Sequence, residues 1–283
     1  MKQIYTAQKN EITEYHIYSN IAKLIKDKKN TKVLLDIAGE ELRHAKFWQT
    51  ITKKDIKPER WKIFKFTLIA RFLGYTFAIK LMEKGEEQAQ INYREISEYI
   101  PEAEQIAEEE EKHESELIAL LDEERLNYVG SIVLGLNDAL VELTGSLAGL
   151  SFALQKTNLI AAVGIITGIA ASLSMGASEY LSTKAEGNNE IALKASLYTG
   201  TAYIVTVLLL VLPYFILDNY LIALLTTLII GILIIFFFNH YVSVAKDLPF
   251  KKRFLEMTFL SLGIAAISFG IGIIIRITLG VDI

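Results

Sequence analysis

Residues 220–243 read YLIALLTTLIIGILIIFFFNHYVS, a run of 24 residues that contains no Asp, Glu, Lys or Arg. About 20 apolar residues in a helix are enough to cross the hydrocarbon core of a bilayer. Comparable runs recur throughout the second half of the chain, and this excludes a purely soluble protein. The sequence predicts five membrane spans, at about 131–155, 159–183, 196–217, 220–243 and 254–279.

The charges divide the chain into two chemically different halves. Residues 1–130 hold 21 of the 29 Lys and Arg and 24 of the 33 Asp and Glu. Basic and acidic residues are interleaved there and the net charge is only -4, so nothing supports nucleic-acid binding. The absence of cysteine excludes disulfides, thiolate-bound metals and a thiol nucleophile. The N-terminus lacks the apolar core of a secretory signal, so we expect the charged half to stay in the cytoplasm.

Apolar residues at three- and four-residue spacing predict helices in the charged half. We place them at about 5–29, 31–52, 61–99 and 101–125, where the third segment allows one very long helix or two in series. Four helical units predict a bundle. The whole chain is therefore expected to be all-α, with a bundle domain at 1–127 and a membrane domain at 128–283.

The charged half contains an internal repeat in which Glu-x6-Tyr precedes Glu-x-x-His. Positions i and i+3 share a helix face, so each Glu-x-x-His can present a carboxylate and an imidazole to one point. Together the two copies offer four carboxylates and two histidines, the ligand set of a carboxylate-bridged di-iron or di-manganese centre. The first copy comprises Glu11, Tyr18, Glu41 and His44, and the second comprises Glu86, Tyr93, Glu110 and His113.

With these motifs, residues 5–125 closely resemble the rubrerythrin branch of the ferritin-like family. The resemblance implies a di-iron centre, with manganese as the alternative, on Glu11, Glu41, His44, Glu86, Glu110 and His113. Glu14, one turn from Glu11, is a candidate for an additional ligand. Tyr18 and Tyr93 flank the site, either as hydrogen-bond or radical partners or as packing residues. We expect the neighbouring glutamates to be solvated, namely Glu40, Glu87, Glu109 and Glu111.

Carboxylates also occur within the predicted membrane spans. Asp138 and Glu142 share one face of the first span, and Met175 and Glu179 share one face of the second. A carboxylate inside a bilayer costs about 2.5–3.5 kcal/mol on insertion scales, so it normally faces a partner or a water-filled path. A carboxylate with a thioether suits Fe²⁺ better than Ca²⁺ or Mg²⁺. These four residues are therefore candidates for an ion path.

The stretches GLNDALV at 135–141 and SLSMGASEYLS at 172–182 are similar to the vacuolar iron transporter (VIT) family, over residues 128–283. The resemblance implies that Asp138 and Met175 line the ion path and that the protein is a homodimer. The sequence departs from the family at Ala139, where Gly commonly follows the Asp, and in the short 184–195 connection. The combined architecture is similar to the membrane-bound ferritin proteins, in which a rubrerythrin-like domain precedes a VIT domain.

The positive-inside rule predicts a multi-pass protein of the cell membrane with the N-terminal domain in the cytoplasm and the C-terminus outside. We expect a transporter that exports Fe²⁺, or Mn²⁺, in exchange for protons, with a cytoplasmic di-metal domain that captures or senses iron. The alternative is a membrane-tethered ferroxidase or peroxidase that needs an external electron donor. The expected inside connections contain Lys184, Lys194, Lys246, Lys251, Lys252 and Arg253, whereas the outside connections contain only Lys156.

Residues 61–81, WKIFKFTLIARFLGYTFAIKL, mix aromatic and basic side chains and are too charged to span a membrane. Lys and Arg can extend to the headgroups while Trp and Phe lie at the boundary of the hydrocarbon. Three placements are open at this point: against the membrane surface, in a dimer contact, or buried within the bundle.

Overall fold

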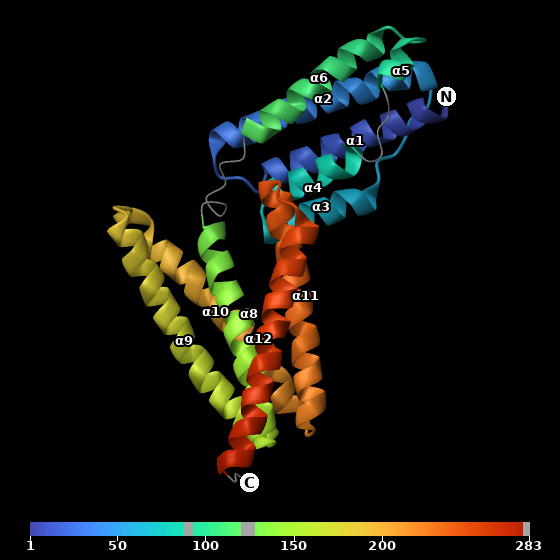
Figure 1. Cartoon of the computed structure of the whole chain (residues 1–283). Helices are drawn as coiled ribbons and strands as arrows, with labels where there is room; N and C mark the ends of the chain where they lie inside the picture. Colours follow the sequence, from blue (N-terminus) through green and yellow to red (C-terminus); the bar gives the residue numbers. More distant parts are fainter. Residues whose placement is uncertain (88–92, 120–127, 280–283) are drawn as a thin grey trace. The chain divides into compact units, whose positions relative to one another are not determined.

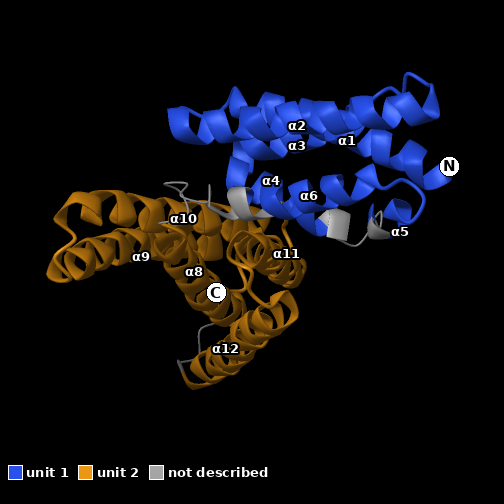
Figure 2. Ribbon diagram, turned by 90° about the horizontal axis from the view of Figure 1, so that it is seen from above, with its two compact units in different colours: residues 1–126 blue, residues 127–283 orange. Residues whose placement is uncertain are grey.

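The computed structural model describes residues 1–87, 93–119 and 128–279, and the regular elements within these ranges are all α-helices (Figure 1). The all-α expectation is therefore confirmed for the described residues. The chain divides into two compact units, Met1–Leu126 and Asn127–Ile283, which Figure 2 colours separately. Each unit has its own buried apolar core.

The first two helices of unit 1 pack against each other. Helix α1 spans Lys2–Ala22 and α2 spans Lys28–Thr52. The prediction that the first helix continues to about residue 29 is wrong. The side chain of Asp27 accepts a hydrogen bond from the backbone N–H of Asn30 at 2.8 Å, which makes Asp27 the N-cap of α2. Polar residues 27–30 therefore belong to the start of α2 and not to the end of the first helix.

A glycine separates the third and fourth helices. Helix α3 (Arg60–Leu73) ends at Gly74, whose φ of 102° and ψ of 149° lie in a region that residues with a Cβ rarely adopt. Helix α4 (Tyr75–Glu87) begins directly after it. This break excludes one long helix over residues 61–99, one of the two arrangements that the sequence allowed.

Unit 1 continues with the short helix α5 (Tyr93–Ser97) and with α6 (Glu102–Ala119), which contacts both α5 and α2. The last residues of the helix predicted at 101–125 lie outside the described ranges. Two apolar clusters form the core of the unit, one containing Leu34 and the other containing Trp48.

Within its described residues, unit 2 contains five helices that are long and apolar enough to cross a membrane. Each predicted span is found, but the helices extend beyond the apolar runs; the third begins at Asn189 rather than at residue 196. Length and composition therefore support a multi-pass membrane protein. The helices are α8 (Val129–Leu154), α9 (Thr157–Ala185), α10 (Asn189–Ile216), α11 (Tyr220–Lys246) and α12 (Phe250–Leu279).

Helix α8 lies at the centre of unit 2, because it contacts each of the other four helices (Figure 1). Buried residues such as Leu140, Leu210 and Tyr214 form the apolar core around it. Small residues allow close approach: a Cβ added to Gly272 on α12 would collide with the carbonyl oxygen of Gly149 on α8. Side chains on α8 are therefore held in place from several directions.

Candidate metal centre and candidate ion path

The candidate metal ligands on α2 and α6 lie on stripes of buried or half-buried residues. On α2 and on α6 the stripe has the same spacing of four, three and four residues, which keeps the side chains on one helix face. In both helices a Glu-x-x-His replaces one turn of an otherwise apolar stripe, so the polar groups point into the unit. The stripe of α2 comprises Ile37, Glu41, His44 and Trp48, and that of α6 comprises Ile106, Glu110, His113 and Leu117.

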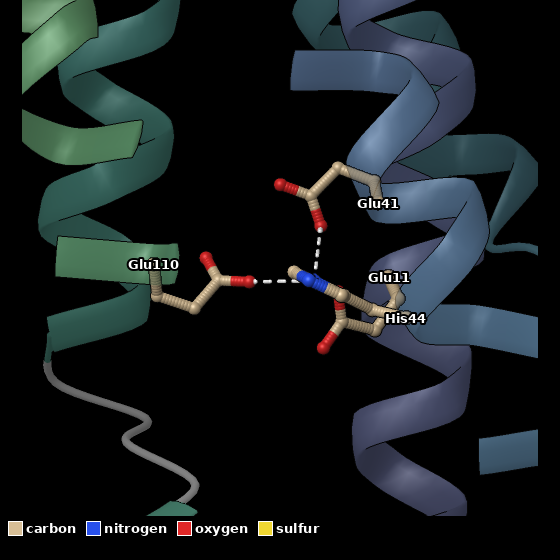
Figure 3. A group of neighbouring side chains, drawn as sticks. All are labelled: Glu11, Glu41, His44 and Glu110. Carbon is tan, nitrogen blue, oxygen red and sulfur yellow. Dashed lines mark hydrogen bonds and ion pairs between the residues drawn. The ribbon is translucent and has the colours of Figure 1, made fainter. Parts of the chain in front are cut away.

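Four of these side chains, from three helices, meet at one point (Figure 3). Ligand atoms of Glu11, Glu41, His44 and Glu110 all lie within 4.8 Å of one another. Nδ1 of His44 lies 3.1 Å from Oε1 of Glu110, 3.4 Å from Oε2 of Glu11 and 3.9 Å from Oε2 of Glu41. The structure thus brings four of the six predicted ligands together, with three carboxylates around the Nδ1 atom of His44.

His113 lies beside this group, with its ring 5.9 Å from the ring of His44. Its Nδ1 is 3.3 Å from Oε1 of Glu41 and 3.8 Å from Oε2 of Glu110. Glu41 and Glu110 therefore each direct one carboxylate oxygen toward each histidine. Glu41 and Glu110 are therefore the residues that could hold a cation beside either histidine.

Burial and the concentration of carboxylates control the protonation of the site. Burial raises the pKa of Glu41 well above its usual range, and the nearby carboxylates of Glu110 and Glu11 raise it further. Burial lowers the pKa of His44, but hydrogen bonds to Glu11 and Glu110 outweigh this effect and raise it to about 10. Burial likewise opposes ionisation of Glu110, yet hydrogen bonds from His113 and His44 lower its pKa to about 2. The metal-free group therefore retains protons that a cation would have to displace.

The outer nitrogen of each histidine is held by a carboxylate from the opposite motif. Nε2 of His44 lies 2.6 Å from Oε2 of Glu109, and Nε2 of His113 contacts Oε2 of Glu40. The expectation that Glu40 and Glu109 are merely solvated is wrong, because each binds a buried imidazole. When Nε2–H donates to a carboxylate, the lone pair of Nδ1 faces the inner group. The signal in the sequence is a doubled glutamate, since both motifs read Glu-Glu-x-x-His.

The two predicted tyrosines both donate hydrogen bonds to glutamates. The hydroxyl of Tyr93 donates to Oε1 of Glu11 at 2.6 Å, so this tyrosine touches the four-residue group directly. The hydroxyl of Tyr18 donates to Oε1 of Glu83 at 2.6 Å. The sequence reasoning missed Glu83, which lies on α4 one turn before Glu86.

Glu14, the candidate additional ligand, is not a member of the four-residue group. Glu14 lies one turn after Glu11 on α1, and its charge adds to the repulsion that, after burial, raises the pKa of Glu41. The side chains of Glu86 and Glu87 lie outside the described residues. The fourth carboxylate of the predicted ligand set therefore stays a prediction.

The donor set fits a divalent cation. Among the described residues, three buried atoms have ion-pair contacts at 3.3–3.9 Å but no hydrogen bond of good geometry, namely Oε2 of Glu11, Oε2 of Glu41 and Nδ1 of His113. Burying such atoms without a good hydrogen bond costs free energy, which a bound ligand can offset. Carboxylate oxygen and imidazole nitrogen are donors that Fe²⁺ and Mn²⁺ accept. These three atoms are thus of the right chemical type for a metal centre.

In unit 2, the candidate ion-path residues lie on two adjacent helices. Asp138 and Glu142 are one turn apart on α8, and Met175 and Glu179 are one turn apart on α9. Asp138 is partly buried, and Met175 packs partly buried against the apolar core. Helices α8 and α9 are in contact.

Two of these carboxylates accept hydrogen bonds from neighbouring helices. The hydroxyl of Tyr203 on α10 donates to Oε2 of Glu142 at 2.8 Å. Ser131, in the first turn of α8, donates to Oε1 of Glu179 at 2.5 Å. Sequence reasoning missed both donors, although a tyrosine within an apolar span is a signal for Tyr203. The two glutamates therefore lie beside different turns of α8, Glu142 at its own position and Glu179 beside Ser131.

Close backbone contact fixes α10 against α8 just before Asp138. A Cβ added to Gly135 would collide with the carbonyl oxygen of Thr199 on α10. The hydroxyl of Thr199 also donates to the carbonyl oxygen of Ser131 at 3.0 Å. The helix that carries Asp138 is thus locked to its neighbour one turn away from this carboxylate.

Comparison with known proteins identifies a family signature in the region that carries these residues. Residues 129–193 match the sequence model of the VIT family, a segment that comprises α8, α9 and the start of α10. A comparison with curated proteins found no significant match. The family match and the five apolar helices together support a membrane domain of the VIT type, which suggests a membrane transporter for metal ions such as iron or manganese.

Proposed function

We propose that the chain exports Fe²⁺ from the cytoplasm in exchange for protons, with Mn²⁺ as a second cargo. The observation that carries this proposal is the presence of three carboxylates and a thioether on α8 and α9, within the segment that matches the VIT family. Carboxylate and thioether together favour a borderline cation over Ca²⁺ or Mg²⁺. Asp138 and Met175 are the proposed ligands of the transported ion.

A homodimer is part of the proposal. Glu142 lies 13 residues after the start of α8, which corresponds to a depth of ~20 Å at 1.5 Å per residue. It is exposed in the single chain, although Tyr203 donates a hydrogen bond to it. A carboxylate at this depth normally faces water or protein rather than lipid. A second copy that covers this face of α8 would enclose a polar path.

We assign proton exchange to Glu142 and Glu179. Each accepts one hydroxyl hydrogen bond. Glu142 lies one turn after Asp138 on α8, whereas Glu179 on α9 is bound by Ser131, which precedes Asp138 on α8. A carboxylate gives up its proton when a dication binds beside it and takes up a proton when the cation leaves. If metal and proton occupy the path alternately, net movement of one drives the other in the opposite direction.

The N-terminal unit is proposed to lie in the cytoplasm and to capture or sense the metal before transport. The support is the group of three buried residues, Glu11, Glu41 and His44, with half-buried Glu110, and with His113 beside it. In a centre with two cations, Glu41 and Glu110 would hold metal together with His44 and His113. Bound iron would supply redox chemistry with oxygen or peroxide.

That chemistry defines the second candidate function, a membrane-tethered ferroxidase or peroxidase. The observation that favours it is the hydrogen bond from Tyr93 to Glu11, which places a half-buried phenol directly on a candidate ligand. In this case the spans would anchor the unit or release its product.

Transport by the purified full chain in proteoliposomes tests the first function. Uptake of Fe²⁺, Mn²⁺, Zn²⁺ and Ca²⁺ should show a preference for Fe²⁺, followed by Mn²⁺. Asp138→Asn keeps the side-chain volume but removes the charge, so it should abolish flux while the metal content of unit 1 is unchanged. Equal Fe²⁺ flux through wild type and Asp138→Asn would remove this residue from the path.

The second function is tested with the same preparations. Oxidation of Fe²⁺ by oxygen or peroxide should depend on His44 and His113 and should survive Asp138→Asn. If wild type oxidises Fe²⁺ but moves no metal across the vesicle membrane, the transporter proposal fails and the enzyme is the better account.

A further inference from the structure

Helix α3 carries an exposed apolar stripe. Trp61, Phe64 and Leu68 are 72%, 56% and 43% exposed, and they follow one another at three- and four-residue spacing. The opposite face of the helix contains Phe66 and Ala70, which are buried in the core of unit 1. The exposed stripe is therefore not needed to hold α3 in place.

Basic residues border this stripe on both sides. At 3.6 residues per turn, Lys62 and Lys65 fall along one edge and Arg60 and Arg71 along the other. All four are exposed, and the sequence of α3 contains no Asp or Glu. The nearest carboxylate to Lys62 in an ion pair is that of Glu59, at 3.8 Å, which is a weak contact at an exposed position. An apolar face between two basic edges is the pattern of a helix that lies in a membrane interface.

We propose that this face of α3 binds the surface of an anionic lipid bilayer. Trp61, Phe64 and Leu68 enter the headgroup region, and the basic edges contact anionic headgroups. The membrane that holds unit 2 supplies this surface. Ten residue steps separate Ala119 from Val129, and an extended chain of that length reaches ~36 Å at most. Unit 1 is therefore tethered within reach of the bilayer, which raises the effective concentration of the lipid surface.

Charge favours lipid over a second copy of the chain as the occupant. A two-fold contact through α3 would bring the four basic residues of one copy against the same four residues of the other. Like charges facing one another across a contact oppose association. Anionic headgroups have the opposite charge, and each Lys or Arg near such a surface contributes attraction. The proposal depends on the membrane spans of unit 2 but not on metal transport.

A spin label on the stripe tests the proposal in the full chain. Because the chain has no cysteine, Leu68→Cys can be labelled with a nitroxide at one position. Leu35→Cys on α2, where the native side chain is 49% exposed, is the matched control. Both are placed in nanodiscs of phosphatidylcholine and phosphatidylglycerol. The label at Leu68 should be accessible to oxygen and protected from a water-soluble nickel complex, whereas the label at Leu35 should be open to nickel.

Charge variants then distinguish binding to anionic lipid from binding to a second copy of the chain. Each lysine at an anionic surface should change the docking equilibrium about fivefold, so Lys62→Gln with Lys65→Gln should lower the ratio of lipid-bound to water-exposed label about 25-fold. Lys28→Gln with Lys29→Gln, exposed on α2, should leave this ratio unchanged. In nanodiscs of pure phosphatidylcholine, the ratio of lipid-bound to water-exposed label should also be lower.

Two results would overturn the proposal. One is a label at Leu68 that is open to nickel in anionic discs. The other is protection that persists in pure phosphatidylcholine together with spin–spin coupling between two labelled chains, which would identify a second copy as the occupant. Tryptophan-detected unfolding of each variant shows whether unit 1 is folded.

Discussion

Replacing Glu41 by Gln should affect the metal-free and the metal-bound chain in opposite ways. Glu41 is buried, and burial together with the nearby carboxylates of Glu110 and Glu11 raises its pKa. Gln has nearly the same shape but cannot ionise, so it relieves this repulsion when metal is absent. With metal present, the same change removes an oxygen donor that lies between the two histidines. Metal should therefore stabilise the variant much less than the wild type.

The size of this effect follows from linkage. A ligand that binds only the folded state stabilises it by about 2.7 kcal/mol at 100 times its Kd. Loss of a residue that supports a metal site weakens binding 10–100-fold, and we take about 100-fold for a direct ligand. The same metal concentration then only equals the Kd, and stabilisation falls to about 0.4 kcal/mol. At roughly 4 °C per kcal/mol for a unit of this size, the metal-induced shift in Tm falls from about 10 °C to about 2 °C.

Fluorescence-detected unfolding of the full chain in detergent measures this shift. Both tryptophans of the chain, Trp48 and Trp61, belong to unit 1, so their emission reports on this unit. Asp36→Asn is the matched control, because it removes one acidic charge from an exposed position of the same helix. Equal metal-induced shifts in wild type and Glu41→Gln would refute the reasoning, and so would an equal loss in Asp36→Asn.

Further predictions concern both units. Met175→Leu should lower Fe²⁺ flux more than Mn²⁺ flux, because the soft thioether favours iron; equal losses in a competition uptake assay would argue against a ligand role. Gly272→Ala should destabilise unit 2 by roughly 1–3 kcal/mol, since its Cβ would collide with a backbone oxygen of α8. Gly270→Ala, where a Cβ would meet nothing within 4 Å, should instead stabilise it by about 1 kcal/mol, and thermal unfolding in detergent compares the two. Metal affinity of unit 1 should rise from about pH 6 to 8, by up to about tenfold per unit, because metal must displace the proton that His44 retains with its pKa of about 10. An affinity independent of pH in a metal titration would contradict the assignment of His44.

Much of the fold could be predicted because apolar periodicity is a strong signal in long helices. The five spans and the paired helices of unit 1 follow from it directly. The boundaries of the helices could not be predicted in this way, since they depend on local hydrogen bonds such as the N-cap at Asp27. Periodicity also continues across Gly74, so the break at this glycine became clear only from its backbone angles.

The four-residue candidate metal group was predictable in part, because an i, i+3 pair on an inward-facing stripe points toward the interior. Glu40 and Glu109 were missed because each contacts a histidine on the opposite helix, and sequence spacing along one helix does not report such contacts. The same reason explains Tyr203, whose partner Glu142 lies on another helix. Contacts between helices depend on how the helices pack, and the spacing of residues in a single sequence does not reveal this packing.

Metal flux under an imposed proton gradient tests the central claim most directly. Proteoliposomes that contain the full chain, a pH-sensitive dye inside and Fe²⁺ outside are compared with and without the gradient. The account predicts that Fe²⁺ moves against the direction of the protons, that the dye reports proton movement only when Fe²⁺ is present, and that Glu142→Gln or Glu179→Gln weakens this coupling more than it weakens Fe²⁺ binding. An Fe²⁺ flux that is indifferent to the gradient in the wild type would contradict proton exchange and identify a channel or a facilitator instead.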